Sequence, residues 1–283
     1  MRCDQPLGDA AHADALRRRV PAPRVPRRSA TLGPGAEPLF GRYPAETLPV
    51  TKAILALTML VGAAQIFATF SHEPSVAALF TGGNAVDAIE QGALVLVPSL
   101  VVEEPWRLVS ACFVHYGALH LLMNMMGLLH LCRLAEPAIG SVRLLIAYVA
   151  TGAIGFLGTV AFHAFTGRMG TTAGASGALF GIMGLVLGFL LKRGDERWKA
   201  WLGQTVVFSV VFGFIMPGVS VNNAAHLVGL ASGVLFGVAF ATGAPQPSTV
   251  WQRALAALLA LGVLASLVLA HASPLPALLR GAS

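Results

Sequence analysis

Long runs of apolar residues, separated by short polar connections, fill the chain after residue 47. A helix needs about 20 apolar residues to cross the hydrocarbon core of a bilayer. Seven stretches reach or approach this length, so the pattern predicts seven transmembrane helices in an all-α polytopic membrane protein. Their expected limits are 48–70, 117–135, 144–165, 174–191, 200–216, 224–241 and 250–270.

The composition agrees with this pattern and excludes a soluble globular protein. Charged residues make up 11% of the 283 residues, and hydrophobic residues make up 55%. Soluble domains carry roughly 25% charged residues, which form their solvated surface. The three cysteines are too few for a disulfide framework.

The net charge of +6 raises the question of a nucleic-acid partner. Eight of the 19 basic residues are arginines before residue 48, where they alternate with proline, alanine and acidic residues and lack interleaved aromatic residues. This mixture is typical of a solvated, charged tail. We therefore interpret residues 1–47 as a disordered basic cytoplasmic tail, and we expect no nucleic-acid partner.

The remaining basic residues predict the orientation in the membrane, because short cytoplasmic loops are enriched in Lys and Arg. With the N-terminus inside, sixteen basic residues lie inside, and three lie outside: Arg107, Arg168 and Arg280. The long outer connection 71–107 contains an apolar patch at 93–102, which predicts a folded element at the interface. The expected divisions are the tail, a core at 48–241, and a linker, seventh helix and short outer tail at 242–283.

Four polar residues are expected at one depth of this arrangement. His120 and Asn124 lie in the first two turns of the second span, Ser176 in the first turn of the fourth, and His226 in the first turn of the sixth. At 1.5 Å per residue, all four fall within roughly 10 Å of the outer helix ends. Polar side chains within spans are costly, so each is a candidate functional residue.

Glycine lines the same faces of the fourth and sixth spans, at spacings of three and four residues. Faces of small residues allow membrane helices to approach closely, and a short serine side chain needs this to reach a histidine on another helix. The glycines are Gly174, Gly177, Gly181, Gly184 and Gly188 in the fourth span, and Gly229, Gly233 and Gly237 in the sixth.

This set of residues is suited to acyl transfer. His226 can accept the proton of Ser176 as a general base, while His120, Asn124 and the Ser176 N–H can donate to an oxyanion. No acidic residue is available at this depth, so a Ser–His dyad is expected. Each residue also has a structural interpretation, since membrane serines often bond a carbonyl one turn back. Without carboxylates or paired cysteines at ligand spacing, we expect neither a metal nor a cofactor.

Several short motifs, in order along the chain, resemble those of the rhomboid intramembrane serine proteases. The match extends over roughly 48–241, and its joint occurrence is far more specific than any one motif. The motifs are Trp106-Arg107, His115-x4-His120-x3-Asn124, Gly174-Ala175-Ser176-Gly177 and Ala225-His226-x2-Gly229-x3-Gly233.

The resemblance implies a six-helix core with a water-filled cavity open to the outside, and a seventh helix of the kind that some members append. It implies that Ser176 is the nucleophile, His226 the base, and His120 and Asn124 oxyanion ligands, with His115 a supporting residue near the cavity mouth. The implied substrates are single-span membrane proteins in the lipid bilayer, cut in or near the outer part of the span. The implied location is the bacterial inner membrane.

The sequence departs from the family pattern at three positions. Phe180 replaces a common tyrosine, Ala224 a common glycine and Ala111 a further histidine. Two other functions are left open. A catalytically silent relative binds membrane helices without cutting them, although such relatives typically lose the serine or the histidine. A transporter or channel is less compatible, because the polar layer lies near the outer ends rather than at the midplane.

Overall fold

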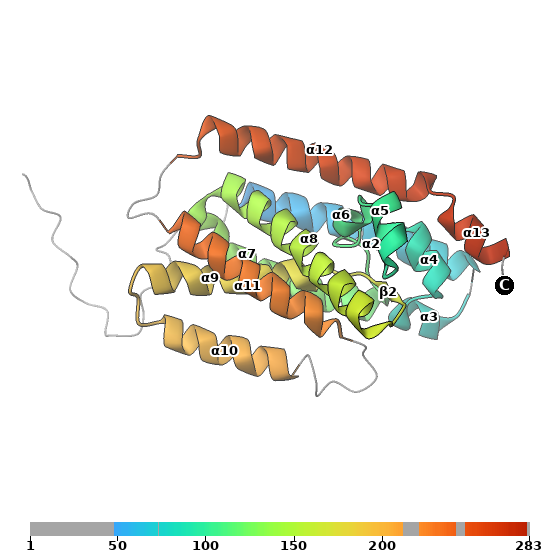
Figure 1. Ribbon diagram of the computed structural model, residues 1–283, viewed down its shortest axis with the longest axis horizontal. Helices are drawn as coiled ribbons and strands as arrows, with labels where there is room; N and C mark the ends of the chain where they lie inside the picture. Colours follow the sequence, from blue (N-terminus) through green and yellow to red (C-terminus); the bar gives the residue numbers. More distant parts are fainter. Residues whose placement is uncertain (1–47, 73, 212–220, 242–246, 282–283) are drawn as a thin grey trace, which may run out of the picture. The chain divides into compact units, whose positions relative to one another are not determined.

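The computed structural model describes residues 48–72, 74–211, 221–241 and 247–281. Within these ranges five helical stretches are long and apolar enough to cross a membrane, as expected for a helical polytopic membrane protein. They are α2 (Pro49–His72), α7 (Gly117–Ile139), α8 (Ser141–Thr166), α11 (Asn223–Phe240), and the stretch Val250–Gly281, which holds α12 (Val250–Ala272) and α13 (Leu275–Gly281). The shorter helices α9 (Ser176–Lys192) and α10 (Trp198–Val210) follow α8 and precede α11 along the chain (Figure 1).

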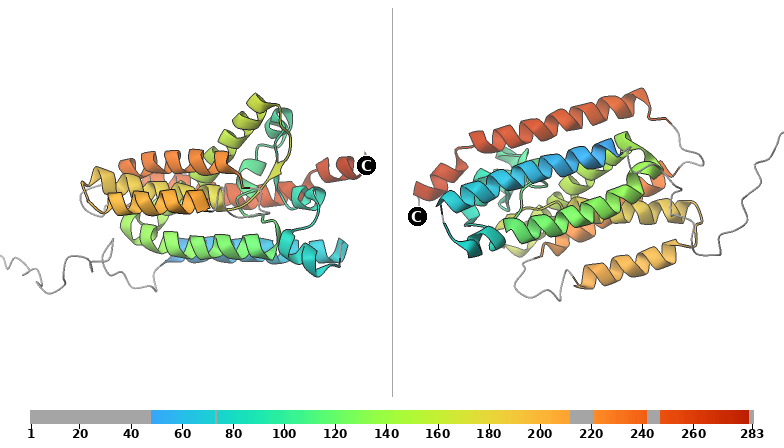
Figure 2. Two further views of the ribbon diagram at one scale, coloured as in Figure 1. Left: turned by 90° about the horizontal axis from the view of Figure 1, so that it is seen from below. Right: turned by 180° about the vertical axis from the view of Figure 1, so that it is seen from behind.

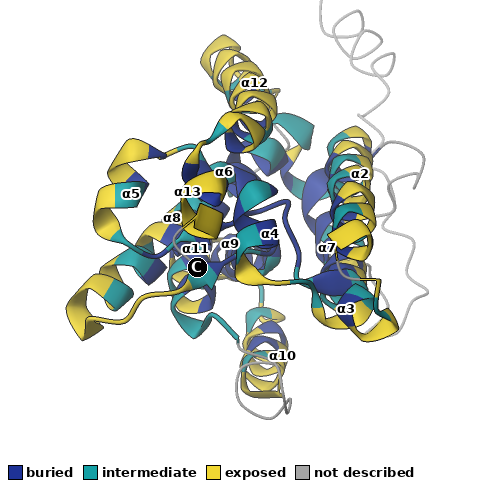
Figure 3. Cartoon of the chain, turned by 90° about the vertical axis from the view of Figure 1, so that its right-hand side faces the viewer, coloured by how far each residue is buried: buried dark blue, intermediate teal, exposed yellow. Residues whose placement is uncertain are grey.

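Helix α9 forms the centre of this bundle. Every residue from Gly177 to Leu190 is buried, and α7, α8, α10 and α11 all pack against the helix. Helices α2 and α7 lie side by side, as the second view in Figure 2 shows. Seen along the helices, α2, α10 and α12 carry many exposed positions (Figure 3). Because most of these side chains are apolar, the exposed faces suit contact with lipid.

The long outer connection is folded, as its apolar patch predicts. It contains α3 (Val76–Thr81), α4 (Ala85–Glu90), β1 (Leu94–Val95), α5 (Pro98–Glu103) and α6 (Arg107–Ser110). Strand β1 pairs antiparallel with β2 (Thr171–Thr172), which lies just before α9. This small sheet was not expected from the sequence, because two-residue strands carry no periodic pattern.

Arg107 holds the outer connection together from within. The residue is 1% exposed, and its guanidinium forms an ion pair with Glu104 and donates from Nη1 to the carbonyls of Ile89 and Ala93 at 2.6 and 3.0 Å. A buried cation that bonds two carbonyls and a carboxylate fixes three segments of the connection at once. The arginine of the Trp106-Arg107 motif therefore has a structural role.

The helix limits differ from the expected spans by a few residues. Helix α7 continues four residues beyond 135, because the carboxylate of Glu136 is buried and accepts from the N–H groups of Val50 and Thr51 at the start of α2. It ends where Gly140 adopts a φ of +86°. Several predictions fall outside the described residues: the tail 1–47, the end of the fifth span at 212–216, the loop around Gly218, and part of the linker, 242–246.

Candidate active site

Ser176 and His226 are in direct contact. Ser176 is the first residue of α9, His226 lies in the first turn of α11, and Ser176 Oγ is 2.8 Å from His226 Nε2. The serine is half-buried and the histidine is buried. Fifty residues of sequence separate the two, so their contact depends on how closely α9 and α11 pack.

Glycine faces bring these two helices together. A Cβ atom added at Gly229 would lie 2.3 Å from the carbonyl oxygen of Gly177, and one added at Gly233 would lie 1.9 Å from that of Gly181. Real Cβ atoms essentially never approach a backbone atom this closely, so neither position has room for a side chain. The backbones of α9 and α11 are thus in contact, as the sequence predicts.

The loop before Ser176 is held by two hydrogen bonds. The N–H of Gly174 donates to the carbonyl of Ala111 at 2.8 Å, and the N–H of Ala175 donates to His115 Nε2 at 3.3 Å. Gly174 has a φ of +128°, which side-chain-bearing residues rarely adopt, so α9 begins at Ser176 rather than at residue 174 as expected. The first N–H groups of a helix lack intrahelical partners, so the Ser176 N–H, at the start of α9, is available to a ligand.

His115 supports the nucleophile loop from within the protein. It is 2% exposed, its N–H donates to Gln65 Oε1 on α2, and its Nδ1 lies 3.2 Å from the carbonyl of Phe113. Burial, with a smaller contribution from His120, lowers the pKa of His115 to about 3, so the ring is neutral and can accept from Ala175. The ring is thus enclosed beside the nucleophile loop, where it supports Ala175, and its place near a cavity mouth stays a prediction.

His120 lies against the same loop. A Cβ atom on Gly174 would lie 3.0 Å from His120 Nε2 and 3.8 Å from Ser176 Oγ, so the ring and the hydroxyl flank one point. His120 Nδ1 accepts the N–H of Tyr116 at 3.2 Å. In a neutral imidazole the other nitrogen then carries the proton, so Nε2 is a donor on the side of Ser176.

Asn124 lies one turn further along α7 and is buried. Its Nδ2 donates to the carbonyl of His120 at 2.9 Å, which occupies one of its two N–H groups. Its Oδ1 is buried and has no hydrogen-bond partner among the residues that the structure describes. The amide therefore has a second N–H available, although part of its hydrogen-bonding capacity is spent within its own helix.

The part of the chain that holds these residues matches a known protein family. The model described as the Rhomboid domain matches residues 102–243, which is half of the chain. The chain belongs to the rhomboid family. The matched region contains Ser176, His226, His120 and Asn124, whereas α2, most of the outer connection and α12 lie outside it.

The chain is also similar to rhomboid proteins of plants, bacteria and protists. The chain is 31% identical to RHOMBOID-like protein 1 of Arabidopsis thaliana over 62% of this chain and 45% of that protein. It is 30% identical to Rhomboid protease GluP of Bacillus subtilis over 57% of this chain and 31% of that one. It is 32% identical to Rhomboid-like protease 5 of Toxoplasma gondii over 53% of this chain and 18% of that protein. The chain thus covers less than half of each of these relatives.

Phe180, where the chain departs from the rhomboid pattern, stacks on the histidine. The two rings lie parallel within 9°, with centroids 4.1 Å apart. No ion pair joins His226 to a carboxylate in the described part of the chain. Stacking therefore restrains the ring where a triad would use an acid.

Asn222 is a site residue that the sequence analysis missed. It caps α11 by accepting from the N–H of Ala225, accepts from Thr159 on α8, and donates to Thr172 on β2 at 2.8 Å. One side chain thus connects the start of the helix that bears His226 to the strand that leads to Ser176. The helix-capping pattern, an Asn before an apolar helix, is the one sequence signal that points to it.

Proposed function

We propose that this rhomboid protein is an intramembrane serine endopeptidase that cleaves single-span membrane proteins in or near the outer part of their spans. The observation that carries the proposal is the 2.8 Å contact between Ser176 Oγ and His226 Nε2. A general base needs this contact to take the proton of a nucleophilic hydroxyl. The names of the Bacillus and Toxoplasma relatives, both called proteases, support the same activity.

In the proposed reaction the Ser176 oxygen attacks the carbonyl carbon of the scissile bond while its proton passes to His226 Nε2. The resulting tetrahedral intermediate carries a negative charge on the former carbonyl oxygen. When the C–N bond breaks, His226 gives the proton to the leaving amine, and an ester to Ser176 remains. A water molecule, with His226 again acting as base, hydrolyses this ester and restores the serine.

The negative charge of the intermediate requires hydrogen-bond donors near Ser176. The backbone N–H of Ser176 and the Nε2–H of His120 are the main donors in our proposal, and the second N–H of Asn124 is the third. Such donors stabilise the transition state because they are already oriented before the charge develops.

Alanine at Asn124 is expected to lower the rate of cleavage by about 10- to 100-fold. Loss of an oxyanion donor typically costs 100-fold or more, and the effect is smaller here because the amide is shared with the His120 carbonyl. The variant should still react with a fluorophosphonate at Ser176, because the dyad is intact. Cleavage kinetics at saturating substrate measure the effect. An unchanged rate would mean that Asn124 serves only helix packing.

The proposed architecture places the dyad in the membrane. Helices α2, α7, α8, α9, α10 and α11 form a six-helix core in this proposal, and α12 is an additional seventh span. The N-terminus is cytoplasmic and the site opens to the outside, in keeping with the distribution of Lys and Arg. For a bacterial cell this is the inner membrane.

The competing proposal is a silent relative that binds membrane helices without cutting them. The hydrogen bond between serine and histidine favours hydrolysis, because a protein that only binds has no need of an activated hydroxyl.

Reconstitution separates these two functions. Purified wild-type protein in liposomes, given a single-span substrate with helix-weak residues in its outer half, is expected to produce two fragments. Mass spectrometry should place the new termini in or near that half. A matched substrate with a polyleucine span should be cut far more slowly, because its helix does not unwind. Absence of fragments from correctly folded protein would support the silent relative.

A further inference from the structure

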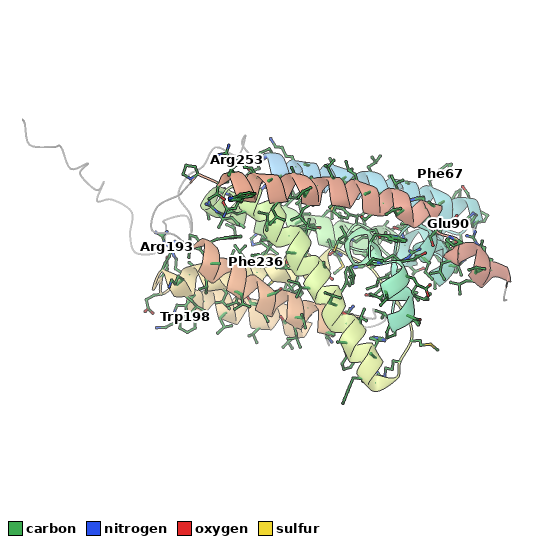
Figure 4. The ribbon with its side chains drawn as sticks, turned by 45° about the horizontal axis from the view of Figure 1, so that its top comes forward. Phe67, Glu90, Arg193, Trp198, Phe236 and Arg253 are labelled. Carbon is green, nitrogen blue, oxygen red and sulfur yellow. The ribbon has the colours of Figure 1, made fainter. Side chains whose placement is uncertain are left out.

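The C-terminal segment of the chain is joined by charged and polar contacts to the outer connection. Arg280 on α13 forms ion pairs with Asp87 and Glu90 on α4, and its Nη2 is 3.1 Å from Asp87 Oδ1. Close by, Ser273 at the end of α12 donates to Glu104. Figure 4 shows Glu90 at the same end of the molecule as α13. None of Arg280, Asp87 and Glu90 lies in the matched rhomboid domain.

Asp87 is the centre of these contacts. Its side chain is 7% exposed, whereas that of Arg280 is 45% exposed. The carboxylate also accepts from Asn84 Nδ2 and contacts His72 Nδ1 at the end of α2. A carboxylate buried to this extent depends on its partners, because few water molecules can replace them. Removal of the arginine is therefore expected to move α4 rather than to leave it in place.

Helix α4 in turn packs against the nucleophile loop. Ala88, which follows Asp87, forms a buried apolar cluster with Ala93 and Val114, and Tyr116 and Ala173 pack against this cluster. Ala173 directly precedes the Gly174–Ser176 segment, and Tyr116 donates the N–H that fixes the tautomer of His120. A displacement of α4 therefore reaches both the nucleophile and an oxyanion donor through direct contacts.

We propose that Arg280 is a positioning residue for the active site: by pairing with Asp87 and Glu90 it holds α4 against the loop that carries Ser176. This inference rests on the proposed protease function. It means that the C-terminal segment, which lies beyond the matched rhomboid domain, helps to position the catalytic residues. The residue touches no substrate and acts through its ion pairs with α4.

The test compares Arg280→Gln with the matched control Arg253→Gln. Arg253 lies at the start of α12, and its guanidinium donates to the carbonyl of Ser248 in the preceding linker (Figure 4). We expect Arg280→Gln to lower both the rate constant of fluorophosphonate labelling at Ser176 and kcat by about tenfold, since sub-ångström shifts of a nucleophile are costly. KM should change less than twofold, because Arg280 touches no substrate, and the thermal midpoint should fall, because the buried Asp87 carboxylate loses a partner. Arg253→Gln should behave as wild type.

Conservative rescue separates positioning from general stability. Arg280→Lys keeps the charge and should retain at least half of the wild-type rate. If Arg280→Gln does not yield folded protein, Glu90→Gln takes its place in the test. It removes one of the two carboxylates that pair with Arg280 and is also expected to lower kcat. The inference would be overturned if Arg280→Gln, or Glu90→Gln used in its place, showed wild-type labelling and wild-type kcat. It would also be overturned if Arg280→Lys were as slow as Arg280→Gln. Either result would leave the protease function intact. A wild-type protein that neither labels nor cleaves would overturn both.

Discussion

Alanine at either Ser176 or His226 is expected to abolish cleavage of a transmembrane substrate. The hydroxyl is a weak nucleophile until His226 Nε2, 2.8 Å away, accepts its proton. Because the two act as a unit, the double variant should be no slower than either single variant. Cleavage assays in liposomes at saturating substrate measure the loss. Insertion should be unaffected, since neither change alters the apolar character of a span.

The matched control for these variants is Ser266→Ala. Ser266 is a buried serine in α12 whose hydroxyl donates to the carbonyl of Val263, the structural role that a membrane serine ordinarily has. It should cleave at the wild-type rate. Cleavage by Ser176→Ala at a rate comparable with wild type would remove the proposed mechanism.

Valine at Gly229 is expected to lower the rate by about 100-fold or more. Its side chain would meet the carbonyl oxygen of Gly177, which already lies 2.3 Å from the position of an added Cβ atom. The backbones of α9 and α11 must therefore separate, and a misplacement of about 1 Å can cost 100-fold in rate. Kinetics of purified protein, normalised to the amount inserted in the membrane, measure the effect.

Gly262→Val is the control for the glycine substitution. Gly262 lies on α12, where an added Cβ atom meets nothing within 4 Å, so the same change should be tolerated there. The Gly229 variant should still insert, because the added side chain is apolar and the charges of the loops are unchanged. Wild-type activity in Gly229→Val would show that this glycine face does not set the distance between Ser176 and His226.

The parts of the fold that follow from local pattern could be predicted. A run such as 144–165 is apolar over a full bilayer thickness, and the structure has α8 at Ser141–Thr166. The contact between Ser176 and His226 also followed, because the two start parallel helices at the same depth and glycine permits close packing. The expected depth of each residue in the membrane thus indicated which distant residues lie near one another, and the sequence of a soluble protein rarely contains this information.

The parts that depend on contacts between distant residues could not be predicted. Glu136 looks like the polar end of a span, yet it is buried because the start of α2 donates to it. His115 lies in the loop before α7, and nothing in its local sequence shows that its ring accepts from Ala175, sixty residues away. No periodicity encodes such pairs, since each depends on how the outer connection folds over the bundle.

The most direct test of the central claim is the reaction of a fluorophosphonate with the purified protein in liposomes, followed by mass spectrometry of the adduct. Only a serine activated by a base reacts readily with this probe, so the measurement does not depend on knowing the substrate. We expect one adduct, on Ser176, in the wild type, and none in Ser176→Ala or His226→Ala. An unmodified Ser176 in folded wild-type protein, or labelling of either alanine variant to the wild-type extent, would contradict this expectation.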